Sequence, residues 1–143
     1  MSILHKSLIL SSSIDQLSTV EQLIDELHER GDINDAIYGN ILVASSEAFL
    51  NAIQHGNNND PTKKTHVTFD IESNNELVVT IKDEGKGFPF ETLPDPTDPE
   101  NLEKINGRGV FIIQNLADSV EFERNGATLK MKFNLEAKDL VEA

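Results

Sequence analysis

One stretch decides the fold: Leu77-Val-Val-Thr-Ile-Lys-Asp83-Glu-Gly85-Lys-Gly87-Phe88. Residues 77, 79 and 81 alternate with 78, 80 and 82, which predicts a strand with one better-buried face. Asp83 then stands at the end of the strand, and Gly85 and Gly87 follow it. Glycine suits a backbone that takes positive φ or lies against a ligand. The stretch predicts either a carboxylate that accepts from a ligand amino group or a solvated Asp before an ordinary glycine turn, and alone it leaves both open.

A long helix is predicted upstream of this strand, beginning at Asn34 or Asp35. Its apolar residues form two adjacent stripes, Ile37, Ile41, Ala44, Ala48 and Ala52 in one and Tyr38, Leu42, Phe49 and Ile53 in the other. Both stripes need cover, so the helix should be well buried. Residues four apart lie about 40° apart around a helix, so Glu47, Asn51 and His55 form a polar ridge beside the stripes.

The polar ridge has two interpretations. A charged group close to a core is costly unless it is paired or binds an ion, which favours a site. The alternative is a partly exposed helix face, with His55 near a frayed end before Gly56.

A glycine pair, Gly107-Arg108-Gly109, precedes a predicted helix over residues 110–118. Glycines that open a helix offer free amides and the positive end of the helix dipole, a natural seat for phosphate oxygens. The alternative is a flexible hinge before an ordinary helix. The polar, proline-rich segment ahead of the pair predicts a mobile lid over about 89–107, or else a plain disordered insertion.

The remaining pattern predicts an α+β fold. A short strand is expected over residues 7–11, then a helix capped by Ser13 or Asp15 that closes at Gly31. A hairpin with Asn74-Asn75 as its turn joins residues 67–71 to 77–82, and a second with Asn125-Gly126 joins 120–124 to 128–135. We expect one domain over residues 1–143, a two-layer sandwich in which a mostly antiparallel sheet of about five strands carries its helices on one face.

Composition narrows the functional class. The 143 residues carry 25 acidic against 12 basic side chains, a formal net charge of −13. That sign argues against a nucleic-acid partner, whose phosphates need cations. The chain has no cysteine, which removes disulfides and thiol chemistry and fits the cytoplasm. No apolar run is long enough for a signal peptide or a membrane span.

An adenine nucleotide meets the demands of all three stretches. Asp83 can accept from the adenine amino group, the glycine loops can lie against ribose and phosphates, and the Asn51 carbonyl oxygen can bind a magnesium ion that also holds phosphate oxygens. Magnesium prefers few protein ligands and several waters. Two other nucleotide-binding motifs do not occur in the sequence: there is no G-x-x-x-x-G-K-[ST] loop, and Phe90 and Ile112 stand where a third glycine would complete G-x-G-x-x-G.

In order along the chain, the three stretches resemble the N, G1 and G2 boxes of the GHKL (histidine-kinase-like) ATPases. The boxes are Glu47-x-x-x-Asn51-Ala-x-x-His55-Gly56, Asp83-x-Gly85-x-Gly87-Phe88 and Gly107-x-Gly109, and the match covers about 7–135. The resemblance implies the Bergerat-type ATP-binding fold. Within the superfamily the chain is most similar to the small anti-sigma-factor serine/threonine kinases, because we expect neither an upstream phospho-acceptor hairpin nor a transducer domain.

The resemblance also implies roles for single residues. Glu47 would be the general base that orients or deprotonates a serine hydroxyl or water in line with the γ-phosphate. Asn51 would hold magnesium, Thr128 would back the adenine-reading Asp83, and Lys104 and Arg108 would stabilise charge on the γ-phosphate. The implied nucleotide-binding residues are Asn51, His55, Asp83, Gly85, Gly87, Phe88, Lys104, Gly107, Arg108, Gly109, Val110 and Thr128.

The resemblance predicts a kinase of a bacterial partner-switching module, which would use ATP and Mg²⁺ to phosphorylate an anti-anti-sigma (STAS-domain) protein and would bind a sigma factor. A homodimer is also expected from it. One position departs from the pattern, since Ile105 stands where sporulation-type kinases place an Arg. That departure favours the alternative of a non-catalytic, nucleotide-gated protein-binding module, and an adaptor without nucleotide is the third hypothesis.

Overall fold

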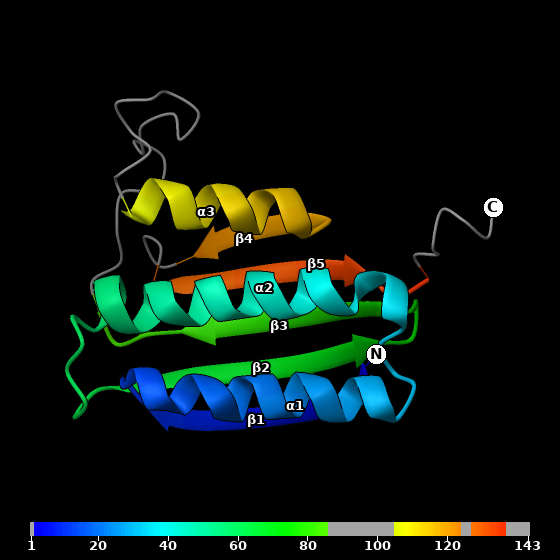
Figure 1. Cartoon of the computed structure of the whole chain (residues 1–143), viewed down its shortest axis with the longest axis horizontal. Coiled ribbons are helices and arrows are strands. Elements are labelled where there is room, and N and C mark those ends of the chain that lie inside the picture. Colours follow the sequence, from blue (N-terminus) through cyan, green and yellow to red (C-terminus); the bar gives the residue numbers. More distant parts are fainter. Residues whose placement is uncertain (1, 86–104, 124–126, 137–143) are drawn as a thin grey trace.

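The computed structural model describes residues 2–85, 105–123 and 127–136. In these ranges five strands form one antiparallel sheet in the order β1-β2-β3-β5-β4, and three α-helices cover one of its faces (Figure 1). The strands are β1 (Ser2–Ser11), β2 (Lys64–Glu72), β3 (Glu76–Lys82), β4 (Ser119–Glu123) and β5 (Thr128–Asn134). The helices are α1 (Leu17–Glu29), α2 (Asp35–Asn51) and α3 (Ile105–Leu116), with a 3-10 turn at Ile14–Gln16 and a π-helical turn at Ala52–Gly56. The predicted α+β sandwich is confirmed.

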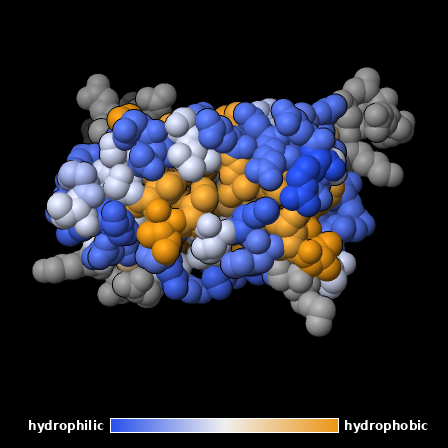
Figure 2. Space-filling view, turned by 90° about the horizontal axis from the view of Figure 1, so that it is seen from below, coloured by the Kyte–Doolittle hydropathy of each residue, from blue (hydrophilic) through white to orange (hydrophobic). Residues whose placement is uncertain are grey.

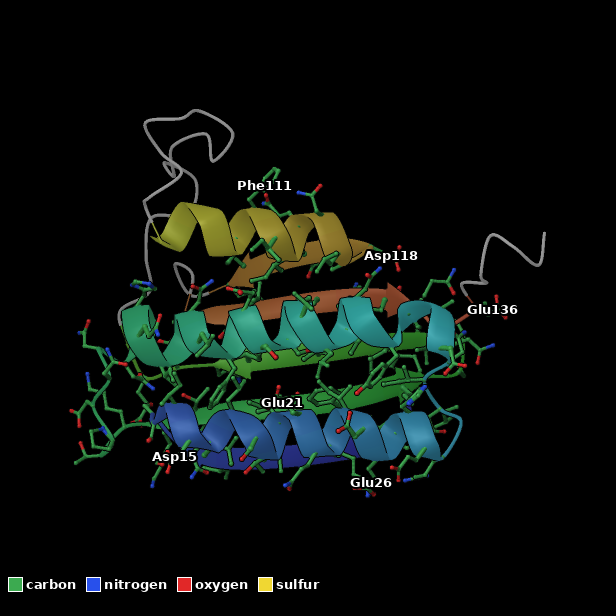
Figure 3. The ribbon with its side chains drawn as sticks, viewed as in Figure 1. Asp15, Glu21, Glu26, Phe111, Asp118 and Glu136 are labelled. Carbon is green, nitrogen blue, oxygen red and sulfur yellow. The ribbon has the colours of Figure 1, made fainter. Side chains whose placement is uncertain are left out.

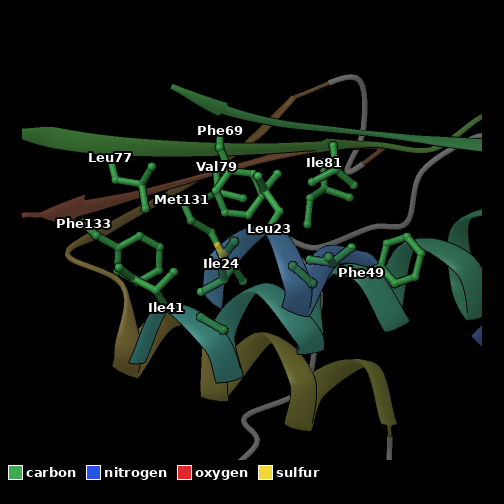
Figure 4. Packing of buried hydrophobic residues seen from close by; sticks show 14 of the residues in the cluster. Leu23, Ile24, Ile41, Phe49, Phe69, Leu77, Val79, Ile81, Met131 and Phe133 are labelled. Atoms are coloured by element: carbon green, nitrogen blue, oxygen red, sulfur yellow. The ribbon is translucent and has the colours of Figure 1, made fainter. Parts of the chain in front are cut away.

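The core lies between the sheet and the helices. Figure 4 shows strand side chains such as Phe69, Val79 and Met131 pointing toward Ile24 and Phe49 of the helices. Each of these five side chains is fully buried or nearly so. The alternation read in β3 and β5 is therefore the alternation of a sheet with one covered face.

Helix boundaries follow the local chemistry of the chain. Asn34 caps α2, its Oδ1 accepting from the Ile37 amide at 3.2 Å, and such caps contribute about 1 kcal/mol. Gly31 follows the end of α1 with φ +86°, a conformation that favours glycine. Both signals were readable in the sequence.

Strand β1 is longer than the predicted segment of residues 7–11. It begins at Ser2 and pairs with β2 from Ser2 opposite Glu72 to Ser11 opposite Lys64. His5 and Lys6 interrupt the apolar pattern in its first half, so the sequence pattern did not predict this part of the strand. Its pairing with β2 in the structure identifies it as strand. Among the described residues, no helix is both long and apolar enough to cross a membrane.

Candidate functional site

The ends of four elements meet at one end of the molecule, the left side of Figure 1. Here α2 and β3 end, while α3 and β5 begin. A pocket at this end is lined by Ala48, Asn51, Ala52, Ile81, Asp83, Phe122 and Leu129. The pocket is open to solvent, and more of its lining surface is apolar than polar. Asn51 and Asp83, 32 positions apart in the chain, thus face one apolar hollow.

Asp83 is the buried carboxylate of this pocket, with 7% of its surface exposed. It directly follows β3, and its backbone amide donates to the Ala127 carbonyl at 3.0 Å. Its Oδ1 accepts from the Gly85 amide at 2.8 Å, so the turn that follows the strand bonds back to the side chain. The carboxylate is therefore held in one orientation by the glycine loop.

Gly56 and Gly85 are glycines because the backbone comes too close for any side chain. A Cβ on Gly56 would lie 2.2 Å from Cγ of Asp83, and a Cβ on Gly85 would lie 2.0 Å from the Gly56 carbonyl oxygen. The end of the π-helical turn is thus packed directly against the Asp83 loop. The first two sequence motifs meet in space.

Gly109 brings the third motif to the same place. A Cβ on Gly109 would lie 2.9 Å from Nδ2 and 3.1 Å from Oδ1 of Asn51, so α3 touches the carboxamide of α2. Val110, the next residue, is buried. All three motifs therefore converge around Asn51 and Asp83.

The prediction that Gly107 and Gly109 precede the helix is wrong. Helix α3 begins at Ile105, so both glycines lie in its first turns and the predicted lid boundary at residue 107 falls inside the helix. A glycine costs a helix up to about 1 kcal/mol relative to alanine, and close contact with α2 supplies a reason for it at position 109. The first four amides of a helix lack intrahelical partners, and in α3 the Gly107 amide is among them.

Thr128 carries an unsatisfied hydroxyl beside the pocket. It is the first residue of β5, pairs with Lys82 next to Asp83, and is 1% exposed. Its Oγ1 is buried without a hydrogen-bond partner among the described residues. A buried polar group without a partner costs about 1–3 kcal/mol, so the site fits a ligand or bridging water that supplies one.

The polar ridge of α2 is interrupted. Glu47 and Asn51 stand one α-helical turn apart and both are partly buried. The chain then changes to the π-helical turn, so the α-helical four-residue spacing does not continue from Asn51 to His55. His55 is partly buried, its Nε2 has no partner among the described residues, and burial lowers its pKa, which keeps the ring neutral near pH 7.

Some predicted site residues lie outside the described ranges. They are Gly87, Phe88 and Lys104, together with most of the predicted lid, and only the helical backbone of Arg108 is described.

The structure also adds residues that the sequence patterns did not assign to the site. Ile81, Phe122 and Leu129 line the pocket, and Asn57 lies behind the Asp83 loop.

Residues 10–133 match the family model of the histidine kinase-like ATPase domain. The chain is 35% identical over 112 residues to an anti-sigma F factor of Heyndrickxia coagulans, which covers 73% of this chain and 74% of that protein. An anti-sigma F factor of Geobacillus stearothermophilus is 39% identical over 94 residues, or 61% of this chain and 62% of that protein. The serine-protein kinase RsbW of Oceanobacillus iheyensis is 29% identical over 106 residues, or 70% and 66% of the two chains.

Solved structures agree on the fold. A histidine kinase domain of the Erythrobacter litoralis EL346 blue-light activated histidine kinase superposes with a TM-score of 0.52 at 20% sequence identity, over 85% of this chain and 60% of that one. The family model covers most of the chain. Asn51, Asp83 and Gly109, which lie within the matched residues, meet at one site. The chain therefore belongs to the histidine kinase-like ATPase domain family.

Proposed function

We propose that this protein is a Mg-ATP-dependent serine/threonine protein kinase. The observation that carries the proposal is the shared pocket of Asn51 and Asp83. Asp83 would accept a hydrogen bond from the adenine amino group. The Thr128 hydroxyl, which has no partner among the described residues, would form a hydrogen bond with the bound nucleotide or a bridging water. The Asn51 carboxamide oxygen suits a magnesium ion, which would neutralise charge on the phosphates.

Glu47 is the proposed general base. It stands one helical turn before Asn51 on α2, so a base and a phosphate-binding group share one rigid element. Glu47 would take the proton of a serine hydroxyl as its oxygen attacks the γ-phosphorus and the bond to the β-phosphate oxygen breaks, releasing ADP. Positioning by a helix suits a reaction in which geometry and charge do most of the work.

The proposed phosphoryl acceptor is a serine of an anti-anti-sigma (STAS-domain) protein, and the second partner is a sigma factor in the bacterial cytoplasm. A relative named anti-sigma F factor supports the sigma factor, and a relative named serine-protein kinase RsbW supports a serine as the acceptor. The STAS-domain protein is what the family resemblance implies. The surface around α1 supports a basic partner, because Asp15 and Glu26, on the outer side of α1 and its preceding turn in Figure 3, are exposed carboxylates. Complementary charge speeds association and selects partners.

Transfer of labelled γ-phosphate from ATP to a purified STAS-domain protein tests the proposal. Wild type is expected to transfer, and Asn51→Ala is expected to lose most of that transfer because magnesium would lose its protein ligand. Asn40→Ala is the matched control, since Asn40 is an exposed Asn on the same helix. Undiminished transfer by Asn51→Ala would remove the metal assignment.

The same assay separates a second candidate function. Ile105 stands where sporulation-type kinases carry an Arg, which favours a module that binds ATP only to gate a protein surface. In that case wild type binds Mg-ATP and captures its partner without any transfer. Absence of Mg-ATP binding in calorimetry would leave only an adaptor role.

We also propose that the protein forms a homodimer through β1. This strand is one edge of the described sheet, and it carries the exposed side chains of Ile3 and Ile9, each more than 60% exposed. Ile14, in the turn after β1, is exposed to a similar degree. Figure 2, viewed from the side of α1 and β1, shows apolar residues in a broken stripe along the long axis. An apolar edge strand is a template for pairing with another chain.

Sedimentation equilibrium tests the dimer. Wild type is expected to sediment as a dimer, and Ile9→Lys is expected to shift it toward the monomer, because the charge would be buried in the interface. Val43→Lys is the control, since Val43 is an exposed apolar residue on α2 and not on β1. Equal association of the two variants would place the interface elsewhere.

A further inference from the structure

Asn57 is a fully buried polar residue behind the Asp83 loop, with none of its surface exposed. Its Nδ2 donates to Ser12 Oγ at 2.6 Å, to the Lys64 carbonyl at 3.1 Å and to Thr65 Oγ1 at 3.2 Å. Its Oδ1 accepts from the Glu84 amide at 2.8 Å. One carboxamide thus connects the ends of β1 and β2 to the loop that follows β3.

The donor side of Asn57 is anchored to buried, hydrogen-bonded residues. Ser12 and Thr65 are buried, and the Ser12 hydroxyl also donates to the Lys63 carbonyl at 3.0 Å. The backbone amide of Asn57 itself donates to the Ala52 carbonyl at 2.9 Å, which closes the π-helical turn. Buried polar networks of this kind fix a geometry when their members are satisfied.

The acceptor side of Asn57 reaches the pocket through two bonds. Asn57 holds the Glu84 amide, and the next amide, that of Gly85, donates to Asp83 Oδ1. The residue before Asn57, Gly56, packs against the same carboxylate. Asn57 does not line the pocket, so it acts on Asp83 through this loop and through its neighbour Gly56.

We propose that Asn57 is the positioning residue of the adenine-reading carboxylate. The role needs an acceptor on one side and donors on the other, and a carboxamide is a neutral group with an acceptor oxygen at one end and two donor hydrogens at the other. The assignment rests on the proposed function, since it presumes that Asp83 reads a nucleotide. Without Asn57 the loop loses its fixed bond, so Asp83 binds the base less well while the chemistry at the γ-phosphate is unchanged.

Three measurements test this role. Calorimetry gives the Mg-ATP affinity, a transfer assay gives the rate at saturating ATP, and thermal unfolding gives the stability. Asn57→Ala is expected to weaken Mg-ATP binding by about tenfold, the loss of roughly one hydrogen bond, with the saturated transfer rate near that of wild type. Thr65→Val is the matched control, because it removes a buried member of the same network and leaves the Glu84 bond in place. It is expected to lower stability without changing affinity.

Asn57→Asp restores only the acceptor side, since its carboxylate can accept from the Glu84 amide but cannot donate to the Lys64 carbonyl. Its Mg-ATP affinity is expected to exceed that of Asn57→Ala, while its thermal stability falls below that of wild type. If Asn57→Ala does not fold, Ser12→Ala/Thr65→Val/Asn57→Leu replaces it, with Ser12→Ala/Thr65→Val as its control. Equal Mg-ATP affinity of Asn57→Ala and Thr65→Val overturns the assignment while leaving the kinase proposal intact. A wild type that binds no Mg-ATP overturns both.

Discussion

Glu47→Gln is expected to slow phosphoryl transfer by about 100- to 10,000-fold while Mg-ATP affinity stays close to that of wild type. This range is what a positioned general base contributes. Gln keeps the length and the hydrogen bonding of Glu, yet its amide cannot take up the proton that the serine hydroxyl loses. The loss should therefore appear in the rate at saturating ATP and not in nucleotide binding. Single-turnover transfer and calorimetry measure the two quantities separately.

Glu26→Gln is the matched control for this experiment. Glu26 is an exposed carboxylate on α1, on its outer side in Figure 3, and its substitution makes the same change in net charge. It is expected to leave transfer unchanged. If Glu47→Gln retained transfer within a few fold of wild type, another group would be the base, and the position of Glu47 before Asn51 would have only a structural role.

Much of the fold could be predicted because residues that face the core recur at the period of the helix or strand that carries them. Alternation in β3 and β5 and the apolar stripes of α2 each follow from one covered sheet face, and they placed those elements within a few residues of their observed bounds. The first half of β1 shows no regular alternation of apolar residues. It is a strand because it pairs with β2, more than 50 residues later in the chain, and a local pattern does not predict such pairing.

The site could be predicted in its residue types but not in its geometry. Asn51, Asp83 and Gly109 were recognisable as motifs, whereas the meeting of Gly109 with Asn51 depends on where α3 packs. The prediction began α3 after Gly109, which is too late. It treated the glycines as residues that need a non-helical backbone, whereas Gly109 is required by its contact with Asn51. Gly56 was visible within its motif, and its close approach to Asp83 was not.

Asn57 was the residue least accessible from sequence alone. It stands in the run Asn57-Asn-Asn-Asp-Pro61, where it is indistinguishable from a solvent-exposed turn residue. Asn58 and Asn59 are exposed with φ of 52° and 58°, as the turn pattern predicts, while Asn57 beside them is fully buried. Burial of a polar residue is set by the elements that close over it, here the ends of β1 and β2.

Asp83→Asn is expected to weaken Mg-ATP binding by about 10- to 100-fold, the value of one hydrogen bond to a charged group. The carboxylate accepts only, so it matches the adenine amino group and opposes the carbonyl oxygen that guanine presents at the same position. An amide in its place can donate as well as accept. The preference for ATP over GTP should therefore shrink along with the affinity, because a site that reads by hydrogen bonding loses discrimination when its acceptor is changed.

Competition of ATP and GTP for a fluorescent ADP analogue measures both effects, with Glu84→Gln as the matched control. Glu84 is the next residue, is exposed and does not line the pocket, and Gln keeps an oxygen that can accept from the Lys64 amide as Glu84 does, so the same loss of charge there should leave both affinities near wild type. In the Asp83→Asn variant the Gly85 amide can still donate to the carboxamide oxygen, which separates lost recognition from a collapsed loop. Equal weakening by the two substitutions would mean that net charge, and not contact with the base, governs binding, and Asp83 would lose its role as the residue that reads adenine.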